Sequence, residues 1–303
     1  MRILITGATG QLGFALASRL QVLGTLIATD RTALDLSQPN SIKPRLDQLA
    51  PELIINAAAY TAVDKAEDEQ DLARIVNAEA PGMMAIWAAA RNVPLIHIST
   101  DYVFGRGGER PWREDDKPVP LSAYGASKLA GEEAVRTAGG DTLIVRTSWV
   151  YAVRGTNFLC TIARLAQERP ELRVVADQIG APTSAAILAD AVARMLNGGT
   201  DSFRASAAKS SGLVHFAASG ETSWHGFAEA IVKGLRARDV PLMAERVVSI
   251  ATEDYPTPAK RPANSRLDLE RLRTVFGINP APWQEALAPE LDQLAQLLEN
   301  KGN

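Results

Sequence analysis

The stretch Gly7-Ala8-Thr9-Gly10-Gln11-Leu12-Gly13 follows the apolar run Arg2 to Thr6 and opens a segment of helical periodicity. Glycines three residues apart allow a sharp turn and let backbone N–H groups approach a ligand closely. The dipole of the following helix stabilises negative charge at the same place. Such a turn is common when taken alone, but its position in the first strand–turn–helix unit is the context that a dinucleotide site requires. The sequence therefore predicts a pyrophosphate-binding turn here.

Short apolar runs alternate with longer amphipathic segments on the C-terminal side of this turn. Continuous apolar strands between helices are typical of a parallel sheet that is covered on both faces. Right-handed crossovers then give an α/β, doubly wound (Rossmann) fold. We expect strands at Arg2–Thr6, Leu26–Thr29, Leu53–Ala58, Pro94–Ser99 and Thr142–Thr147, and helices at Phe14–Leu23, Leu72–Arg91 and Tyr124–Arg136.

The second half of the chain keeps less of this rhythm, and prolines interrupt it repeatedly from residue 241 onward. We expect strands at Leu172–Ala176 and Leu213–Ala217, a helix at Ala185–Leu196, and a surface loop at Ser202–Gly212. The remainder suits a smaller, cap-like domain built from loops and short elements. The predicted organisation is a dinucleotide-binding domain of residues 1–152 plus about 183–216, interleaved with a C-terminal substrate domain of about 153–182 plus 217–303.

Composition excludes several classes of protein. The net charge of −3 is spread without long like-charged blocks, which argues against nucleic-acid binding. The single cysteine excludes an intramolecular disulfide. There is no charged leader and no apolar stretch of about 18 residues, so we expect a cytoplasmic protein with no membrane partner. Three scattered histidines are too few for the usual metal sites, and His97, inside an apolar run, is interpreted as a core residue.

The ribose side of the predicted nucleotide site has two candidate contacts. The second strand ends at Asp30, about 20 residues after the turn, where a carboxylate can accept hydrogen bonds from ribose hydroxyls. Arg31 follows at once and can instead neutralise a 2′-phosphate. The two neighbours favour opposite cofactors, so the choice between NADH and NADPH stays open.

Tyr124 and Lys128 lie four residues apart at the start of an expected helix and so share one helix face. We expect the positive charge of Lys128 to lower the pKa of the Tyr124 phenol and to make it a proton donor near neutral pH. Such a pair is frequent by chance. The interpretation is strengthened by Ser99-Thr100 at the end of the preceding strand, because strand carboxyl ends carry the site in open α/β sheets. We expect the Thr100 hydroxyl to orient a carbonyl beside the phenol.

Together, the glycine turn and these three residues resemble the extended short-chain dehydrogenase/reductase family and, more narrowly, its dTDP-4-dehydrorhamnose reductase branch. The resemblance covers essentially the whole chain, and its blocks occur in family order. These blocks are Asn56-Ala57-Ala58-Ala59-Tyr60-Thr61-Ala62-Val63-Asp64, Ser99-Thr100-Asp101-Tyr102-Val103-Phe104, Arg146-Thr147-Ser148-Trp149-Val150-Tyr151, Asp177-Gln178-Ile179-Gly180-Ala181-Pro182-Thr183 and Arg261-Pro262-Ala263-Asn264-Ser265-Arg266-Leu267.

The resemblance implies hydride transfer from NADPH or NADH to the C4 keto group of dTDP-4-dehydro-L-rhamnose, the last step of dTDP-L-rhamnose synthesis. It assigns catalysis to Thr100, Tyr124 and Lys128. The implied cofactor contacts are Gly7, Gly10, Gln11, Leu12 and Gly13 at the pyrophosphate, Asp30 or Arg31 at the ribose, Asp35 and Leu36 at the adenine, Ala57, Ala58 and Ala59 along the nicotinamide, and Tyr124 and Lys128. The implied substrate contacts are Val63, Thr100, Asp101, Tyr102, Trp149, Arg261 and Asn264.

Other activities share this scaffold. The related 4,6-dehydratases carry a Thr-Asp-Glu run, and the third position here is Tyr102, so the elimination base is missing. An epimerase would keep Tyr124 and Lys128 but hold its cofactor permanently. A related branch serves as a non-catalytic, dinucleotide-binding regulatory subunit of methionine adenosyltransferase, and the intact catalytic set argues against that role.

The sequence departs from the family at one point. Some of these reductases join two subunits through a magnesium ion held by glutamates, and the positions aligned with those ligands are Ala15, Ala186 and Gln284 here. None is the charged oxygen ligand that magnesium prefers. We therefore expect no bridging metal, and either a monomer or a metal-free homodimer.

Overall fold

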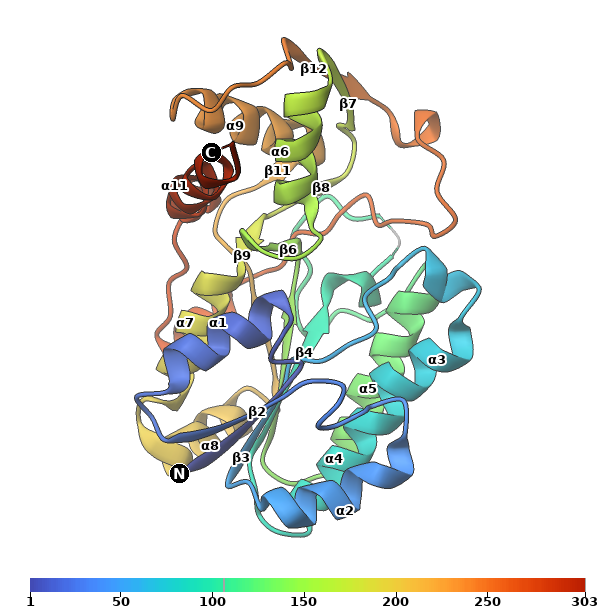
Figure 1. Ribbon diagram of the computed structural model, residues 1–303. Coiled ribbons are helices and arrows are strands. Elements are labelled where there is room, and N and C mark those ends of the chain that lie inside the picture. Colours follow the sequence, from blue (N-terminus) through green and yellow to red (C-terminus); the bar gives the residue numbers. More distant parts are fainter. Residues whose placement is uncertain (106, 303) are drawn as a thin grey trace.

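A six-stranded parallel sheet forms the centre of the lower half of the molecule (Figure 1). The computed structural model describes residues 1–105 and 107–302. The strand order is β2-β1-β3-β4-β5-β10, so the chain reverses direction across the sheet between β1 and β3. The predicted doubly wound α/β fold is therefore confirmed. The strands are β1 (Arg2–Thr6), β2 (Thr25–Thr29), β3 (Leu53–Asn56), β4 (Leu95–Thr100), β5 (Thr142–Thr147) and β10 (Leu213–Phe216).

Helices cover both faces of this sheet because successive strand residues point to opposite sides. In β1, Ile3 and Ile5 pack into one buried cluster, whereas Leu4 packs into the other. The first face carries α1 (Gln11–Leu20), α7 (Ala185–Leu196) and α8 (Gly199–Lys209), and the second carries α2 (Pro39–Leu49), α4 (Ala80–Ala89) and α5 (Ala123–Ala138) (Figure 1).

The helix expected at Leu72–Arg91 is interrupted near its start. The segment begins with α3 (Gln70–Arg74), continues through a π-helical turn η2 (Ile75–Glu79) and ends in α4, and the short helix η1 (Lys65–Glu67) precedes it. Such turns are rare and occur often at functional sites. Here the turn carries Asn77, whose amide accepts a hydrogen bond from the Tyr60 backbone N–H and donates to the Ser127 hydroxyl. The π turn thus ties the loop after β3 to helix α5.

The segment Ser202–Gly212, expected as a loop, was predicted wrongly. Most of it belongs to α8, which ends at Lys209. Phe203 and Ala207, four residues apart, are buried in the cluster between the sheet and helices α1 and α7. Burial of this one face outweighs the serine content that suggested a loop.

A third buried cluster lies above the sheet and holds three long helices (Figure 1). The expectation of loops and short elements is wrong here, because α9 and α11 have 13 and 20 residues. The helices are α6 (Phe158–Glu168), α9 (Trp224–Arg236) and α11 (Trp283–Gly302), beside the strand pairs β7 (Glu171–Val175) with β12 (Arg246–Ile250), β8 (Ile179–Gly180) with β11 (Thr222–Ser223), and β6 (Val150–Tyr151) with β9 (Thr183–Ser184).

The chain passes between the sheet and this third cluster more than once. After α9 it returns to the sheet, where α10 (Glu270–Phe276) contacts β10. Leu272 and Ile278 join the cluster on the sheet face that carries α1, α7 and α8. The division into two domains stays a prediction. It assigns residues 270–276 to the substrate domain, whereas α10 packs against the sheet. Among the described residues, no helix has both the length and the apolar character needed to cross a membrane.

Candidate active site

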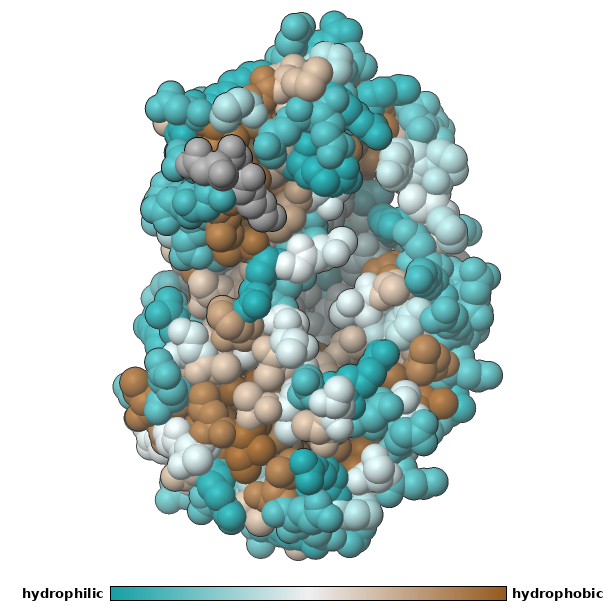
Figure 2. All heavy atoms as spheres, viewed as in Figure 1, coloured by the Kyte–Doolittle hydropathy of each residue, from teal (hydrophilic) through white to brown (hydrophobic). Residues whose placement is uncertain are grey.

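A cavity of about 680 Å³ opens at the carboxyl ends of the sheet strands, below the third cluster. Figure 2 shows the hollow between the two halves of the molecule. In open α/β sheets this edge is where ligands bind. Most residues proposed from the sequence line it: Gly7, Gly10, Gln11, Leu12, Asp30, Arg31, Asp35, Leu36, Ala57, Ala58, Ala59, Val63, Thr100, Asp101, Tyr102, Tyr124, Lys128 and Trp149.

The glycine turn forms one end of this cavity. Gly7 has φ +65°, and the Gly10 N–H donates to its carbonyl at 2.9 Å. Gly13 does not line the cavity, because it is packed against the turn, and a Cβ there would lie 2.1 Å from the Gly7 oxygen. The first turn of α1 therefore sits close enough to point free N–H groups at a bound anion. This cradle of backbone donors at a glycine turn fits a dinucleotide pyrophosphate.

The acidic and basic residues after β2 lie at the same end. Asp30 uses Oδ1 to accept from the N–H and hydroxyl of Thr32 and from the Ala33 N–H, and no described residue bonds to Oδ2, which can accept from a ribose. These hydrogen bonds lower the pKa of Asp30. Hydrogen bonds from the N–H and hydroxyl of Ser37 lower the pKa of Asp35, and the charge of Arg31, exposed at the rim, adds to this effect. Both the NADH-type and the NADPH-type contact are thus available.

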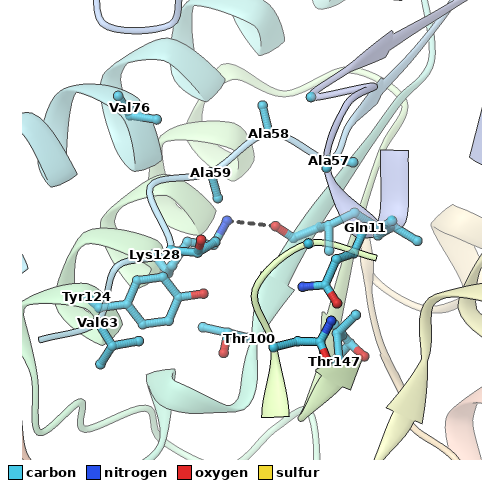
Figure 3. A pocket seen from close by; sticks show the side chains of 18 of the residues that line it. Gln11, Ala57, Ala58, Ala59, Val63, Val76, Thr100, Tyr124, Lys128 and Thr147 are labelled. Atoms are coloured by element: carbon cyan, nitrogen blue, oxygen red, sulfur yellow. Dashed lines mark hydrogen bonds between the residues drawn. The ribbon is translucent and has the colours of Figure 1, made fainter. Parts of the chain in front are cut away.

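The floor of the cavity is the segment after β3. The strand ends at Asn56 rather than at Ala58, so Ala57, Ala58 and Ala59 turn along the cavity wall (Figure 3). The Ala58 N–H donates to the Thr6 hydroxyl, which fixes this turn to β1. Three small side chains leave room for a flat ring to lie against the backbone.

The three proposed catalytic residues converge in the middle of the cavity (Figure 3). Thr100 is the last residue of β4, and its hydroxyl accepts from the Tyr102 N–H and donates to Asp101. Tyr124 lies in the first turn of α5, which Ser122 caps by accepting from the Gly125 N–H. Lys128, one turn later, donates from Nζ to the Ile98 carbonyl at 2.7 Å.

Burial sets the electrostatics of this group. The pKa of Tyr124 is raised, chiefly because burial disfavours the phenolate, and a hydrogen bond with Thr100 offsets only part of that effect. The expectation that Lys128 lowers it is wrong for the chain alone, since the ammonium turns to Ile98 and contributes nothing to that shift. Burial also lowers the pKa of Lys128 to about 8 and raises that of Asp101 to about 6.

A buried ion pair fixes α5 to β5 just beneath these residues. Arg146 binds Glu132 through two hydrogen bonds of 2.8 and 2.6 Å, and both side chains are almost fully buried. The Ser99 hydroxyl donates to the same carboxylate at 2.5 Å. Because a lone buried charge is strongly destabilising, this pair holds the helix of Tyr124 and Lys128 in register with β4.

Aromatic rings enclose the sugar end. Tyr102 meets Tyr124 edge to face at 5.5 Å. Trp149, at φ +49°, stacks on Trp224 with ring centroids 3.6 Å apart. Trp224 is the first residue of α9, so this stack joins the segment after β5 to the helices above the sheet.

Two of the expected substrate contacts, Arg261 and Asn264, lie outside the cavity lining. Arg261 forms an ion pair with Asp64 at 2.8 Å. The Asn264 amide donates to the Gly108 and Arg110 carbonyls and accepts from Arg266. Their proposed role therefore requires these contacts to rearrange.

Several lining residues were not identified from the sequence. Trp224 follows a serine cap in a region expected to be loops, and that capping signal could have placed it at a helix start. Thr147 pairs with Thr100 at the adjacent strand end, and its buried hydroxyl has no partner among the described residues. Segment 154–158 crosses opposite the glycine turn, with Arg154 stacked over the Phe14 ring.

Comparisons with known proteins agree with this geometry. The family model described as RmlD substrate binding domain matches residues 1–296. A dTDP-4-dehydrorhamnose reductase of Burkholderia thailandensis is 48% identical over 291 residues, covering 95% of this chain and 97% of the relative.

Two solved structures give the same result. A dTDP-4-dehydrorhamnose reductase of Clostridium acetobutylicum has a TM-score of 0.88 and 37% identity, covering 97% of this chain and 99% of that one. A reductase of the same name from Bacillus anthracis, in complex with NADP, has a TM-score of 0.85 and 36% identity over 96% and 99% of the two chains. The chain therefore belongs to the RmlD substrate-binding-domain family, the family of the dTDP-4-dehydrorhamnose reductases.

Proposed function

We propose that this chain reduces the C4 keto group of dTDP-4-dehydro-L-rhamnose to the alcohol of dTDP-L-rhamnose, with NADPH or NADH as the reductant. The observation that carries the proposal is the shared cavity, in which Thr100, Tyr124 and Lys128 converge beside the glycine turn. Relatives over nearly the full length that carry the reductase name support the substrate.

The bound cofactor supplies the hydride, and the chain supplies orientation and the proton. Thr100 donates a hydrogen bond to the sugar carbonyl, which exchanges for its present bond to Asp101. The buried Tyr124 phenol stays protonated at neutral pH and gives its proton to the oxygen that becomes the alcohol. The Lys128 ammonium stabilises the phenolate that remains, which is the charge that burial alone disfavours.

The sugar nucleotide occupies the aromatic end of the cavity in this proposal. Val63, Asp101, Tyr102 and Trp149 line that end. Arg261 and Asn264 would join it from the later part of the chain after releasing their present partners. Trp224, stacked on Trp149, belongs with this set.

The predicted absence of a bridging metal is retained as part of the proposal. Ala15, Ala186 and Gln284 lie on α1, α7 and α11 and offer no carboxylate. Among the described residues, no group of three histidine, cysteine or acidic side chains is placed to hold a metal. We propose a monomer or metal-free homodimer in the cytoplasm, where the reduced cofactor is supplied. Loss of activity or dissociation on adding a chelator would contradict this.

The direct test is the decrease in NADPH absorbance, and separately NADH absorbance, with enzymatically supplied dTDP-4-dehydro-L-rhamnose. Rapid oxidation with formation of dTDP-L-rhamnose is expected. Tight cofactor binding without oxidation would instead favour a non-catalytic binding subunit. A purified protein that retains a stoichiometric nicotinamide would favour an epimerase.

A further inference from the structure

The amine of Lys128 has a neighbour that the proposed mechanism does not use. It lies in the protein interior, and its bond to the Ile98 carbonyl appears as the dashed line in Figure 3. On the strand side, 3.5 Å from Nζ, lies Nε2 of His97. His97 is completely buried in β4, three residues before Thr100. A polar ring at this fully buried position, between Ile96 and Ile98, calls for a physical reason.

The contacts of His97 determine which ring nitrogen carries the proton. The Thr6 hydroxyl accepts from the Ala58 N–H, so its own proton goes to Asn56 Oδ1 at 2.6 Å. This orients the amide so that Asn56 Nδ2 donates to His97 Nδ1 at 3.0 Å. Nδ1 is therefore an acceptor, and the neutral ring has its N–H on Nε2. That N–H points toward the Lys128 amine.

Two donors face each other when Lys128 is charged. Burial and the nearby ammonium hold the pKa of His97 well below its usual value, so the ring stays neutral. A neutral Lys128 amine can accept from Nε2–H, whereas the ammonium cannot. The contact therefore favours the uncharged lysine. Glu132 on the same helix acts in the opposite sense, but its carboxylate is already engaged by Arg146 and Ser99.

We propose that His97 is a positioning residue for the reaction, which sets the pH at which the Lys128 amine, hydrogen-bonded to the Ile98 carbonyl, gains and loses its proton. The inference rests on the proposed reductase function. Its consequence is a pH limit on catalysis. The charged amine stabilises the phenolate, so turnover should fall as pH rises and Lys128 loses its proton. In the chain without ligands, burial lowers the pKa of Lys128 to about 8.

The ring state can be observed without any substitution. The chain has only three histidines, so ¹⁵N-histidine labelling gives three ring systems. Variants of His97 and His215 assign them. We expect the wild-type His97 ring to be neutral and protonated on Nε2 from pH 6 to pH 9. A ring protonated on Nδ1, or on both nitrogens, would overturn the proposal.

The kinetic test uses His97→Gln, whose side-chain carbonyl can turn to the ammonium and accept from it. That change favours charged Lys128, so the alkaline fall in kcat should move to higher pH by about one unit, with the KM for NADPH little changed. The matched control is His215→Gln. His215 is equally buried in β10 of the same sheet and bonds to the Trp112 carbonyl rather than to Lys128. His215→Gln should leave the pH of the alkaline fall in kcat unchanged.

The outcomes separate this inference from the proposed function. If wild-type protein oxidises NADPH but His97→Gln has an unchanged pH profile, the role of His97 is wrong and the reductase stands. If wild-type protein turns over no keto sugar, the function fails, and the Lys128 titration followed by ¹³Cε-lysine NMR still decides the inference. An upward shift in His97→Gln supports it, and an unchanged titration refutes it. Lys128→Met assigns the resonance.

Discussion

The two ends of the cavity are built in different ways. At the cofactor end, one continuous segment forms the site, because the turn of residues 7–13 shapes it through its backbone. At the sugar end, side chains arrive from β4, α5, the end of β5 and the start of α9. The first kind of site is visible in a short stretch of sequence. The second exists only when distant segments have been brought together.

The largest expected effect is at the point where the two ends meet. Tyr124→Phe removes the proton donor without changing the shape of the ring, so kcat should fall by roughly 10²–10⁴. Cofactor affinity should be nearly unchanged, because the glycine turn is untouched. Stopped-flow kinetics and a fluorescence titration of NADPH measure the two quantities. Tyr60→Phe, which removes a hydroxyl that donates to Glu69, is the control, and near-normal turnover of Tyr124→Phe would remove the residue from the mechanism.

A backbone-built site should be broken by a single methyl group. Gly13→Ala places a Cβ 2.1 Å from the Gly7 carbonyl oxygen, so the turn must open. We expect a loss of about 1–3 kcal/mol in the free energy of unfolding and at least about tenfold weaker NADPH binding. Urea denaturation and calorimetric titration measure these. Ser18→Ala, on the exposed side of the same helix, should change neither, and equal behaviour of the two variants would contradict the role of the turn.

The cofactor end also contains the choice between the two nicotinamides. Arg31→Ala removes the exposed charge at the rim while leaving Asp30 and its capping hydrogen bonds in place. The KM for NADPH should rise by about tenfold and that for NADH should stay within about twofold, since a charged hydrogen bond to phosphate is lost. Parallel assays with both cofactors test this. A similar change for both cofactors would show that Arg31 does not contact a 2′-phosphate.

The smallest expected effect concerns the sugar end alone. Trp224→Ala removes one ring of the Trp149 stack, which is worth about 0.5–1.5 kcal/mol beyond its buried area. The KM for the sugar nucleotide should rise by roughly 3–10-fold, with the KM for NADPH constant. Trp87→Phe, on α4 away from the cavity, controls for loss of an indole. A rise in the KM for NADPH alone would show that Trp224 acts at the cofactor end and would contradict its placement at the sugar end.

The same contrast explains how far the sequence could be interpreted. The β1–turn–α1 unit, the parallel strands and the Tyr124–Lys128 face follow from local periodicity and spacing, and the structure contains them all. Helix α8 was missed because its polar residues outnumber the Phe203 and Ala207 that bury it. Trp224 was missed because its partner Trp149 is 75 positions earlier in the chain, measured from their residue numbers.

Electrostatics was the least predictable part. Spacing placed Lys128 near Tyr124 correctly, but the side chain turns to Ile98 and His97, which no helix pattern indicates. Burial then reverses the expected direction of the Tyr124 pKa shift. Sequence spacing predicts which side chains share a face, whereas the pKa depends on where each polar atom finds its partner.

The most direct test of the account is to follow the hydride itself. NADPH carrying deuterium at the transferred position of nicotinamide C4 is incubated with the protein and dTDP-4-dehydro-L-rhamnose, and the product is analysed by NMR. One cavity that holds both ligands and reduces the ketone predicts one deuterium at C4 of dTDP-L-rhamnose. A product with no deuterium at C4, or with the label at another carbon, would contradict it.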